Sequence, residues 1–177
     1  MFTGHHILKF ALPGTLKVIV YPAAWKLAED REKYFPIFDQ RAYAECDVKS
    51  GTINFVMVDC FPADIPYLSD MEYLDAIGNE PTVVLCLSST NKNAMQSVRR
   101  MFIELQNRYI KNPVVLVTDS MWQTADEHLI HYATEAGALL LDGLGDGICL
   151  GLTEAAYHQF ADAQQTVSGR RYTSPTG

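Results

Sequence analysis

The sequence lacks long hydrophobic runs, paired cysteines and an excess of basic residues, and each absence excludes a class of protein. The longest strictly apolar runs, such as Val83–Leu87, have about five residues, whereas a membrane-spanning helix needs roughly 20. Lys and Arg number 14 against 21 Asp and Glu, which gives a formal net charge of -7. Because nucleic acids and anionic membranes attract cationic surfaces, this balance argues against both as partners.

The four cysteines stand far apart, at positions 46, 60, 86 and 149. No CxxC pair is present, so the usual spacings of a zinc site, an iron–sulfur cluster or a thioredoxin-type redox centre are missing. The N-terminus carries no basic leader, which argues against a secretory signal. We therefore expect free thiols in a cytoplasmic protein. Cys60, Cys86 and Cys149 lie in or beside apolar runs and are expected to be small buried core residues.

The chain alternates between short apolar runs and longer segments with helical spacing, which is typical of repeated βα units and a parallel sheet. We expect one α/β domain over residues 1–166 and a flexible polar tail over 167–177. The fold class is a partial or distorted TIM-barrel-like fold or an open parallel sheet of roughly five or six strands. The expected strands are Leu16–Val20, Ile53–Val58, Val83–Leu87, Val114–Val117 and Ala138–Leu141, with Arg41–Val48 as an extra one.

Helices are expected between these strands. Apolar residues spaced by three or four positions run from Ala94 to Tyr109, which indicates an amphipathic helix. A second such pattern runs from Trp122 to Ala136, with Gly137 placed to end the helix in a left-handed conformation. Further helices are expected over Ala24–Tyr34, Leu68–Ile77 and Thr153–Gln164.

Polar side chains follow four of the expected strands and mark a candidate site. Asp59, Ser88, Thr118 and Asp142 each come just after an apolar run. Ligands of parallel βα folds bind at the carboxyl ends of the strands. A site there would gather Asp59, Ser88, Ser89, Thr118, Asp119, Asp142 and Asp146. The alternative is that Ser89 or Thr90, and Asp119 or Ser120, only cap the helices that follow them.

The segment Asp142–Gly147 is unusual because three glycines alternate with other residues. Gly143, Gly145 and Gly147 permit positive φ angles and close approach of a ligand. The segment matches neither GxGxxG nor a P-loop, and its two aspartates would repel a phosphate. A tight structural turn is the favoured interpretation, and a ligand or partner loop formed by Asp142, Gly143, Gly145, Asp146 and Gly147 is the alternative.

Metal and nucleophile motifs are weak. His128 and His131 lie three residues apart beside Asp126 and Glu127, a spacing that can bring two imidazoles to one metal. No third ligand is identifiable, so an exposed helix face is favoured and no metal is assigned. No Ser, Cys or Lys has the local setting of a catalytic nucleophile, and we assign no catalytic residue.

Two blocks of sequence resemble an enzyme family. Residues 133–150 read ATEAGALLLDGLGDGICL, and residues 112–126 read NPVVLVTDSMWQTAD. They are similar to the inserted middle domain of the long, three-domain form of 4-hydroxy-3-methylbut-2-enyl diphosphate synthase, the iron–sulfur enzyme of the non-mevalonate isoprenoid pathway. The close resemblance covers about 40 residues and the rest matches in its βα rhythm. This chain has no CPxCGR-like motif, so no cluster ligand or catalytic acid of the family carries over.

The resemblance implies a non-catalytic, scaffolding domain without activity by itself. Its partners would be the flanking catalytic and cluster domains of the same enzyme, with a homodimer as an option, and the 4Fe–4S cluster would lie in the missing C-terminal domain. The alternative is a stand-alone small-molecule-binding domain or a Mg²⁺-dependent enzyme that uses the strand-end carboxylates Asp59, Asp119, Asp142 and Asp146.

Overall fold

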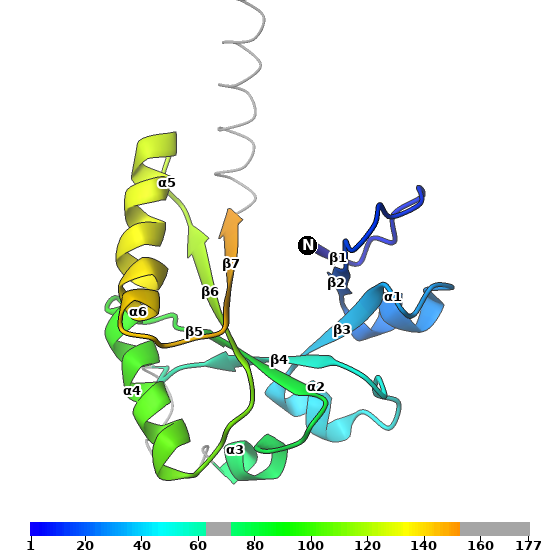
Figure 1. The fold of residues 1–177 in the computed structure, drawn as a ribbon, viewed down its shortest axis with the longest axis horizontal. Coiled ribbons are helices and arrows are strands. Elements are labelled where there is room, and N and C mark those ends of the chain that lie inside the picture. Colours follow the sequence, from blue (N-terminus) through cyan, green and yellow to red (C-terminus); the bar gives the residue numbers. More distant parts are fainter. Residues whose placement is uncertain (63–71, 153–177) are drawn as a thin grey trace, which may run out of the picture.

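A computed structural model describes residues 1–62 and 72–152, and these form a curled half-barrel of parallel strands with alternating helices. The sheet in this part of the chain has seven strands, hydrogen-bonded in sequence order from β1 to β7. In Figure 1 the sheet curls into two arms, and the helices lie along its outer side. The strands are β1 Phe2–Gly4, β2 Val18–Val20, β3 Tyr34–Asp39, β4 Asn54–Asp59, β5 Val83–Ser88, β6 Val114–Ser120 and β7 Gly147–Leu152.

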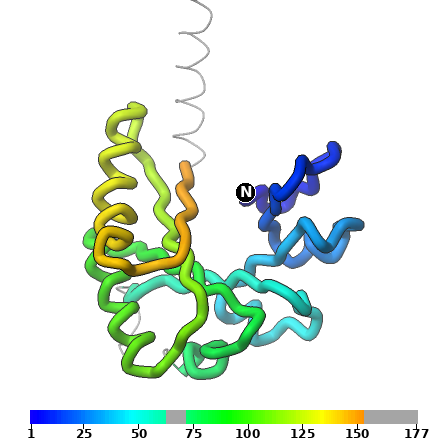
Figure 2. The backbone as a smooth tube through the Cα atoms, viewed as in Figure 1, coloured from blue at the N-terminus to red at the C-terminus, as the bar shows by residue number. Residues whose placement is uncertain are grey.

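The helices connect successive strands, as a parallel sheet requires. The tube in Figure 2 shows the resulting U-shaped path, with the N-terminal strands on one arm and β6 and β7 on the other. The structure thus confirms the expected partial-barrel α/β fold. The helices are α1 Pro22–Leu27, α2 Gln40–Glu45, α3 Glu72–Ile77, α4 Ala94–Asn107, α5 Ala125–Tyr132, the π-helical turn η2 Ala133–Gly137, and α6 Ala138–Leu141.

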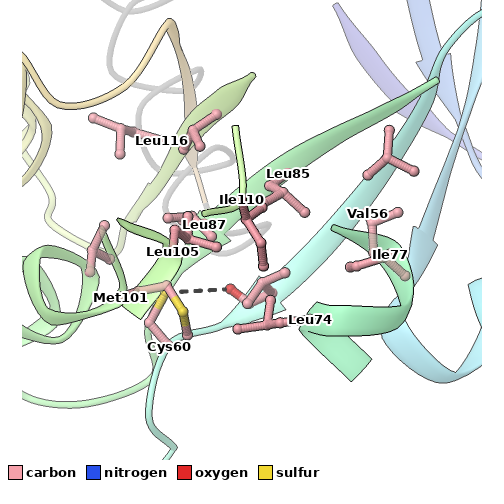
Figure 3. Close-up of a cluster of buried hydrophobic side chains, with 14 of the residues drawn as sticks. Val56, Cys60, Leu74, Ile77, Leu85, Leu87, Met101, Leu105, Ile110 and Leu116 are labelled. Carbon is pink, nitrogen blue, oxygen red and sulfur yellow. Dashed lines mark hydrogen bonds between the residues drawn. The ribbon is translucent and has the colours of Figure 1, made fainter. Parts of the chain in front are cut away.

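The main hydrophobic core lies between the outer face of the sheet and the helices (Figure 3). Alternate residues of β4 and β5, such as Val56 and Leu85, are buried and meet Leu74 of α3 and Met101 of α4. Cys60 is also buried, and its Sγ lies 3.7 Å from the Val58 carbonyl oxygen (Figure 3). This cysteine is therefore a core residue, as its apolar setting in the sequence indicates.

A second, smaller core supports the N-terminal arm. Trp25 and Ala24 of α1 pack with Val18 and Val20 of β2 and with Tyr34 of β3. The Arg31 guanidinium lies 5.0 Å from the centre of the Trp25 ring, a cation–π contact that closes this core on one side.

Several expected elements are confirmed. The apolar runs over 53–58, 83–87 and 114–117 form β4, β5 and β6, and the run over 16–20 contains β2. The pattern from Ala94 gives α4, and the described part of the helix expected over 68–77 is α3. The expected helix over 153–164 and the tail over 167–177 lie outside the described residues.

The run Ala138–Leu141 was expected to be a strand, and this expectation is wrong. These residues form α6, which continues directly from α5 through η2, and Gly137 has helical φ and ψ angles of -62° and -38°. Gly137 therefore does not end a helix. Alanine and leucine are strong helix formers, and a short apolar run does not separate a buried strand from a buried helix. The strand that follows β6 is β7, which begins at Gly147.

Two N-terminal expectations also need correction. The helix expected over 24–34 ends at Leu27, and Tyr34 begins β3 instead. The strand expected over 41–48 is the helix α2. The Asp39 carboxylate begins this helix by accepting a hydrogen bond from the Ala42 N–H at 2.7 Å, and Arg41 pairs with Glu45 one turn later.

Candidate functional site

A cleft of about 280 Å³ opens at the carboxyl ends of β5 and β6. Its walls are the loop after β5, the first turns of α4, and the helical run that contains η2. Its lining combines polar residues with apolar ones such as Leu87, Val98 and Leu116. The residues that matter for its chemistry are Ser88, Ser89, Thr90, Asn91, Lys92, Thr118, Asp119, His131 and Glu135.

The structure brings together four of the residues expected at this edge and gives some of them structural partners. Ser88, Ser89, Thr118 and Asp119 line the cleft. Asp59, at the end of β4, accepts hydrogen bonds from the Thr90 N–H at 3.1 Å and the Thr90 hydroxyl at 2.9 Å. The Asp59 carboxylate therefore ties the end of β4 to the loop after β5.

Ser89 has a similar role. Its hydroxyl donates to the Cys60 carbonyl at 3.0 Å and accepts from the Asn91 N–H at 3.2 Å. The residue before α4 is Asn93, whose side chain makes no capping hydrogen bond. The capping role expected for Ser89 or Thr90 is thus wrong, because the chain makes a further turn before α4 begins.

A side chain from elsewhere in the chain accepts a hydrogen bond from the first turn of α4. The Glu135 carboxylate accepts a hydrogen bond from the Met95 N–H at 2.7 Å. This contact satisfies one of the donors that a helix start leaves open, and it holds η2 against α4. Sequence reasoning missed Glu135, since the π-helical turn that carries it has no readable signal.

The ends of β6 and β7 are held by three residues of α5. Ser120 is buried, and its hydroxyl lies 2.7 Å from Nδ1 of the buried His128. His131 Nε2 lies 3.1 Å from the Asp119 carbonyl oxygen, and the Tyr132 hydroxyl donates to the Gly151 carbonyl at 2.6 Å. Burial raises the pKa of the Tyr132 hydroxyl, with Asp119 adding to the effect.

These contacts test the expectations about the two histidines and the N-terminal cap of α5. His128 and His131 turn to different partners, Ser120 and the Asp119 carbonyl, so their spacing does not create a shared metal position. His128 is buried rather than on an exposed face. The helix is capped by Thr124, not by Asp119 or Ser120.

The cap of α5 is a capping box that the sequence displays as Thr124-x-x-Glu127. The Thr124 hydroxyl accepts from the Glu127 N–H, and the Glu127 carboxylate accepts from the Thr124 N–H at 3.1 Å. The Thr124 hydroxyl also donates to this carboxylate, and these bonds lower the Glu127 pKa. The S/T-x-x-E pattern could have been recognised from the sequence.

The glycine-rich segment lies at the opposite edge of the sheet. The Asp146 carboxylate accepts from the Val114 N–H at 2.8 Å, and the Asp146 N–H donates to the Val114 carbonyl at 2.7 Å. Val114 is the first residue of β6, so Asp146 fixes the start of that strand. Gly147 then pairs with Val115 as β7 begins.

The rest of the segment is a turn between α6 and β7. Gly143 and Gly145 have φ angles of +74° and +93°, which favour glycine. The Asp142 carboxylate forms an ion pair with Arg99 of α4. Asp142 and Asp146 therefore do not meet Asp59, Ser88, Thr118 and Asp119, because α6 ends at the edge where the strands begin.

Metal-ligating side chains do not gather into one cluster among the described residues. In residues 1–62 and 72–152, no three His, Cys, Asp or Glu side chains come together as a metal site. Cys60, directly after β4, and Cys86, within β5, are both buried. Burial raises the pKa of both thiols, that of Cys86 to about 12. Of the four carboxylates considered for Mg²⁺, Asp59 and Asp119 lie at the carboxyl ends of the strands, whereas Asp142 and Asp146 lie at the opposite edge of the sheet.

Within residues 1–62 and 72–152, no helix combines the length and the apolar character that crossing a membrane would need.

Comparison with known proteins gives three related sequences. The chain is 31% identical over 138 residues to 4-hydroxy-3-methylbut-2-en-1-yl diphosphate synthase (flavodoxin) of Phocaeicola vulgatus, a match that covers 77% of this chain and 21% of the synthase. The enzymes of the same name from Bacteroides thetaiotaomicron and Parabacteroides distasonis are 30% and 28% identical over 63% and 78% of this chain.

Other comparisons give no match: neither a family model nor a solved structure matches the chain. The chain spans about a fifth of the length of the curated relatives it matches. Over most of its length, therefore, the chain resembles one segment of 4-hydroxy-3-methylbut-2-en-1-yl diphosphate synthase.

Proposed function

We propose that this chain is a non-catalytic inserted domain of a 4-hydroxy-3-methylbut-2-enyl diphosphate synthase, acting as a scaffold in the non-mevalonate isoprenoid pathway. The observation that carries the proposal is the match of 138 residues to a fifth of the synthase from P. vulgatus. The catalytic and cluster domains of the enzyme would flank it, with the 4Fe–4S cluster in the cluster domain. The assembled enzyme would work in the cytoplasm.

The hydrogen bonds at both sheet edges support a structural role. Asp59 is engaged by Thr90, and Asp146 by Val114. Glu135 is engaged by the start of α4. Acidic groups that already accept two hydrogen bonds, or that fix a strand or helix terminus, stabilise the half-barrel, and a scaffold needs that rigidity more than it needs a reactive group.

A chimaera tests the proposal. The matching segment of the P. vulgatus synthase is replaced by this chain, and formation of 4-hydroxy-3-methylbut-2-en-1-yl diphosphate is measured. We expect an active chimaera, an inactive deletion of the segment, and unchanged kcat when Ser88→Ala or Asp119→Asn is introduced. Circular dichroism and the thermal midpoint serve as folding controls.

Two results would overturn the scaffold proposal. The first is a folded Ser88→Ala or Asp119→Asn chimaera with a markedly lower kcat, since that would place the cleft in the chemistry. The second is full activity after deletion of the segment, since an enzyme that works without the segment does not need it as a scaffold.

The cleft favours a second candidate function, which is binding of a small molecule at the ends of β5 and β6. Its volume of about 280 Å³ and its polar residues Ser88 and Thr118 are the supporting observations. ¹H–¹⁵N NMR spectra of the full chain, titrated with Mg²⁺ and then with inorganic phosphate, test it. Shifts confined to the cleft residues support binding. Spectra that do not change with either probe contradict binding of a metal ion or phosphate there.

A further inference from the structure

The first 28 residues of the chain contain no acidic side chain. They carry three lysines and two histidines, whereas the rest of the chain carries 21 Asp and Glu against 11 Lys and Arg. The net charge of -7 therefore combines a cationic N-terminal region with an acidic remainder. Such an asymmetry of charge within one chain indicates a surface for a partner of opposite charge.

The lysines of this region are not neutralised by carboxylates of the chain. Among the described residues, no ion pair involves Lys9, Lys17 or Lys26. The Lys17 ammonium donates instead to the Glu32 carbonyl oxygen at 2.7 Å. Lys9 and Lys26 are exposed. Their positive charge is therefore available to acidic groups from outside the chain.

The segment His5–Lys17, here called the N-terminal strip, runs from the end of β1 to the start of β2 and is the dark blue loop in Figure 1. Two hydrogen bonds order it. The Leu8 N–H donates to the Tyr34 hydroxyl at 3.1 Å, and the Lys33 ammonium donates to the Leu12 carbonyl at 2.8 Å. Because the strip is already ordered, binding a partner costs little conformational entropy.

Exposed aromatic rings accompany the strip. Phe10, next to Lys9, is 62% exposed. At the beginning of the strip, the rings of Phe2 and His5 pack on the Tyr21 ring, with centres 5.4 and 4.6 Å apart. Phe2 and Tyr21 nevertheless remain 45% and 40% exposed. Aromatic rings held in place at a surface are typical anchors of protein–protein interfaces.

We propose that the N-terminal strip docks an acidic segment of a separate protein. Carboxylates of that segment meet Lys9 and Lys17, and its apolar side chains cover Phe10 and the pair formed by Phe2 and Tyr21. Opposite charges speed the encounter of two separate molecules, whereas a domain of the same polypeptide needs no such attraction. The inference does not depend on the scaffold role proposed above.

A short acidic segment fits this surface better than an extended polyanion does. A nucleic acid or an anionic membrane reaches beyond the strip and meets the acidic remainder of the chain, which repels it. A protein segment can contact the strip alone. The sign of the charge on the strip thus selects an acidic partner, and the charge of the remainder selects a small one.

Binding of labelled peptides to the full chain, measured by fluorescence anisotropy, is the first test. The peptides EEFEEFEE, QQFQQFQQ and KKFKKFKK have the same aromatic content and differ in charge. We expect EEFEEFEE to bind, with an affinity that falls as salt is raised from about 0.05 to about 0.5 M. QQFQQFQQ should bind more weakly, and KKFKKFKK should not bind.

Three variants locate the binding surface. Lys9→Glu is expected to weaken binding of EEFEEFEE by about fivefold, the upper range for one exposed ion pair. Phe10→Ser should weaken it as well, through loss of the aromatic anchor. Lys111→Glu is the matched control, because it makes the same change of charge at an exposed residue outside the strip, and it should leave the affinity unchanged. All three positions are exposed, so equal thermal midpoints serve as the folding control.

Several results would overturn the proposal. They are absence of EEFEEFEE binding, equal binding of EEFEEFEE and KKFKKFKK, and an effect of Lys111→Glu as large as that of Lys9→Glu. Tighter binding of a uridine oligonucleotide or of phosphatidylserine vesicles than of EEFEEFEE would replace the acidic protein with another polyanion. A dimer of the parent chain in light scattering that is lost in Lys9→Glu would show that a second copy covers the strip instead.

Discussion

Replacing Asp146 distinguishes a structural turn from a ligand loop at the glycine-rich segment. The Asp146 carboxylate accepts a hydrogen bond from the N–H of Val114, a residue that is only 4% exposed. Removing the acceptor in Asp146→Ala leaves a donor at the start of β6 with poor access to water. A lost bond of this kind costs about 1–3 kcal/mol. Since Asp146 itself is exposed, we expect a loss near the lower end, about 1–2 kcal/mol.

Urea unfolding followed by circular dichroism measures this loss as a lower midpoint with an unchanged slope. At this chain length each kcal/mol corresponds to about 2–4 °C in the thermal midpoint. Asp146→Asn keeps an oxygen acceptor and is expected to recover at least half of the loss. Asp47→Ala, at an exposed loop residue, is the control and should stay within about 0.5 kcal/mol of the parent chain.

Two outcomes would refute this reasoning. If Asp146→Ala is as stable as the parent chain, the hydrogen bond to Val114 does not secure the start of β6. If Asp146→Asn is as unstable as Asp146→Ala, the negative charge rather than the acceptor matters, as it would in a cation-binding loop.

Three more predictions follow from single contacts. Gly78→Ala should destabilise the chain by several kcal/mol in urea unfolding, because a Cβ there would lie 2.6 Å from the Leu74 carbonyl oxygen; a midpoint unchanged from the parent would contradict the close packing. The Cys86 thiol, with its pKa raised from 9.0 to about 12 by burial, should resist iodoacetamide at pH 8. Because the Cys86 thiol loses its proton at lower pH in the unfolded chain than in the folded one, the free energy of unfolding should fall between pH 9 and 12. Rapid alkylation at pH 8 would contradict the raised pKa. The same pH dependence of stability in Cys86→Ala as in the parent chain would contradict it too. Thr124→Ala should cost about 1 kcal/mol by removing the α5 cap, and hydrogen exchange should rise in the first turn around Glu127; equal exchange rates would show that the cap is dispensable.

Sequence patterns predicted the secondary structure correctly where only one type of secondary structure suits a segment. The run Val83–Leu87 is apolar and rich in β-branched residues, and the helix from Ala94 has apolar residues at intervals of three and four. Both form as expected because the local preference and the burial in the core favour the same structure. The same agreement explains why the parallel α/β class and the partial barrel could be predicted.

The sequence alone also showed which polar residues lie at or near the carboxyl ends of the central strands. Asp59, Ser88 and Thr118 lie at one edge of the sheet because parallel strands all end on the same side. Which of them line the cleft, and which are engaged in hydrogen bonds such as the one from Thr90 to Asp59, depends on loop paths that no periodicity encodes.

Tertiary structure alone decided the C-terminal part of the described fold. Ala138–Leu141 satisfies a strand or a helix equally well by its apolar character, and the choice was made by burial of Leu139 against the core and by continuation of α5 through Gly137. That choice carries Asp142 and Asp146 to the edge where strands begin, away from Asp119. Residue types and spacing thus determined the repeating units, whereas long-range packing determined which edge of the sheet each acidic residue occupies. A helix at 138–141 runs opposite to the parallel strands, so the residues that follow it lie where the strands begin rather than where they end.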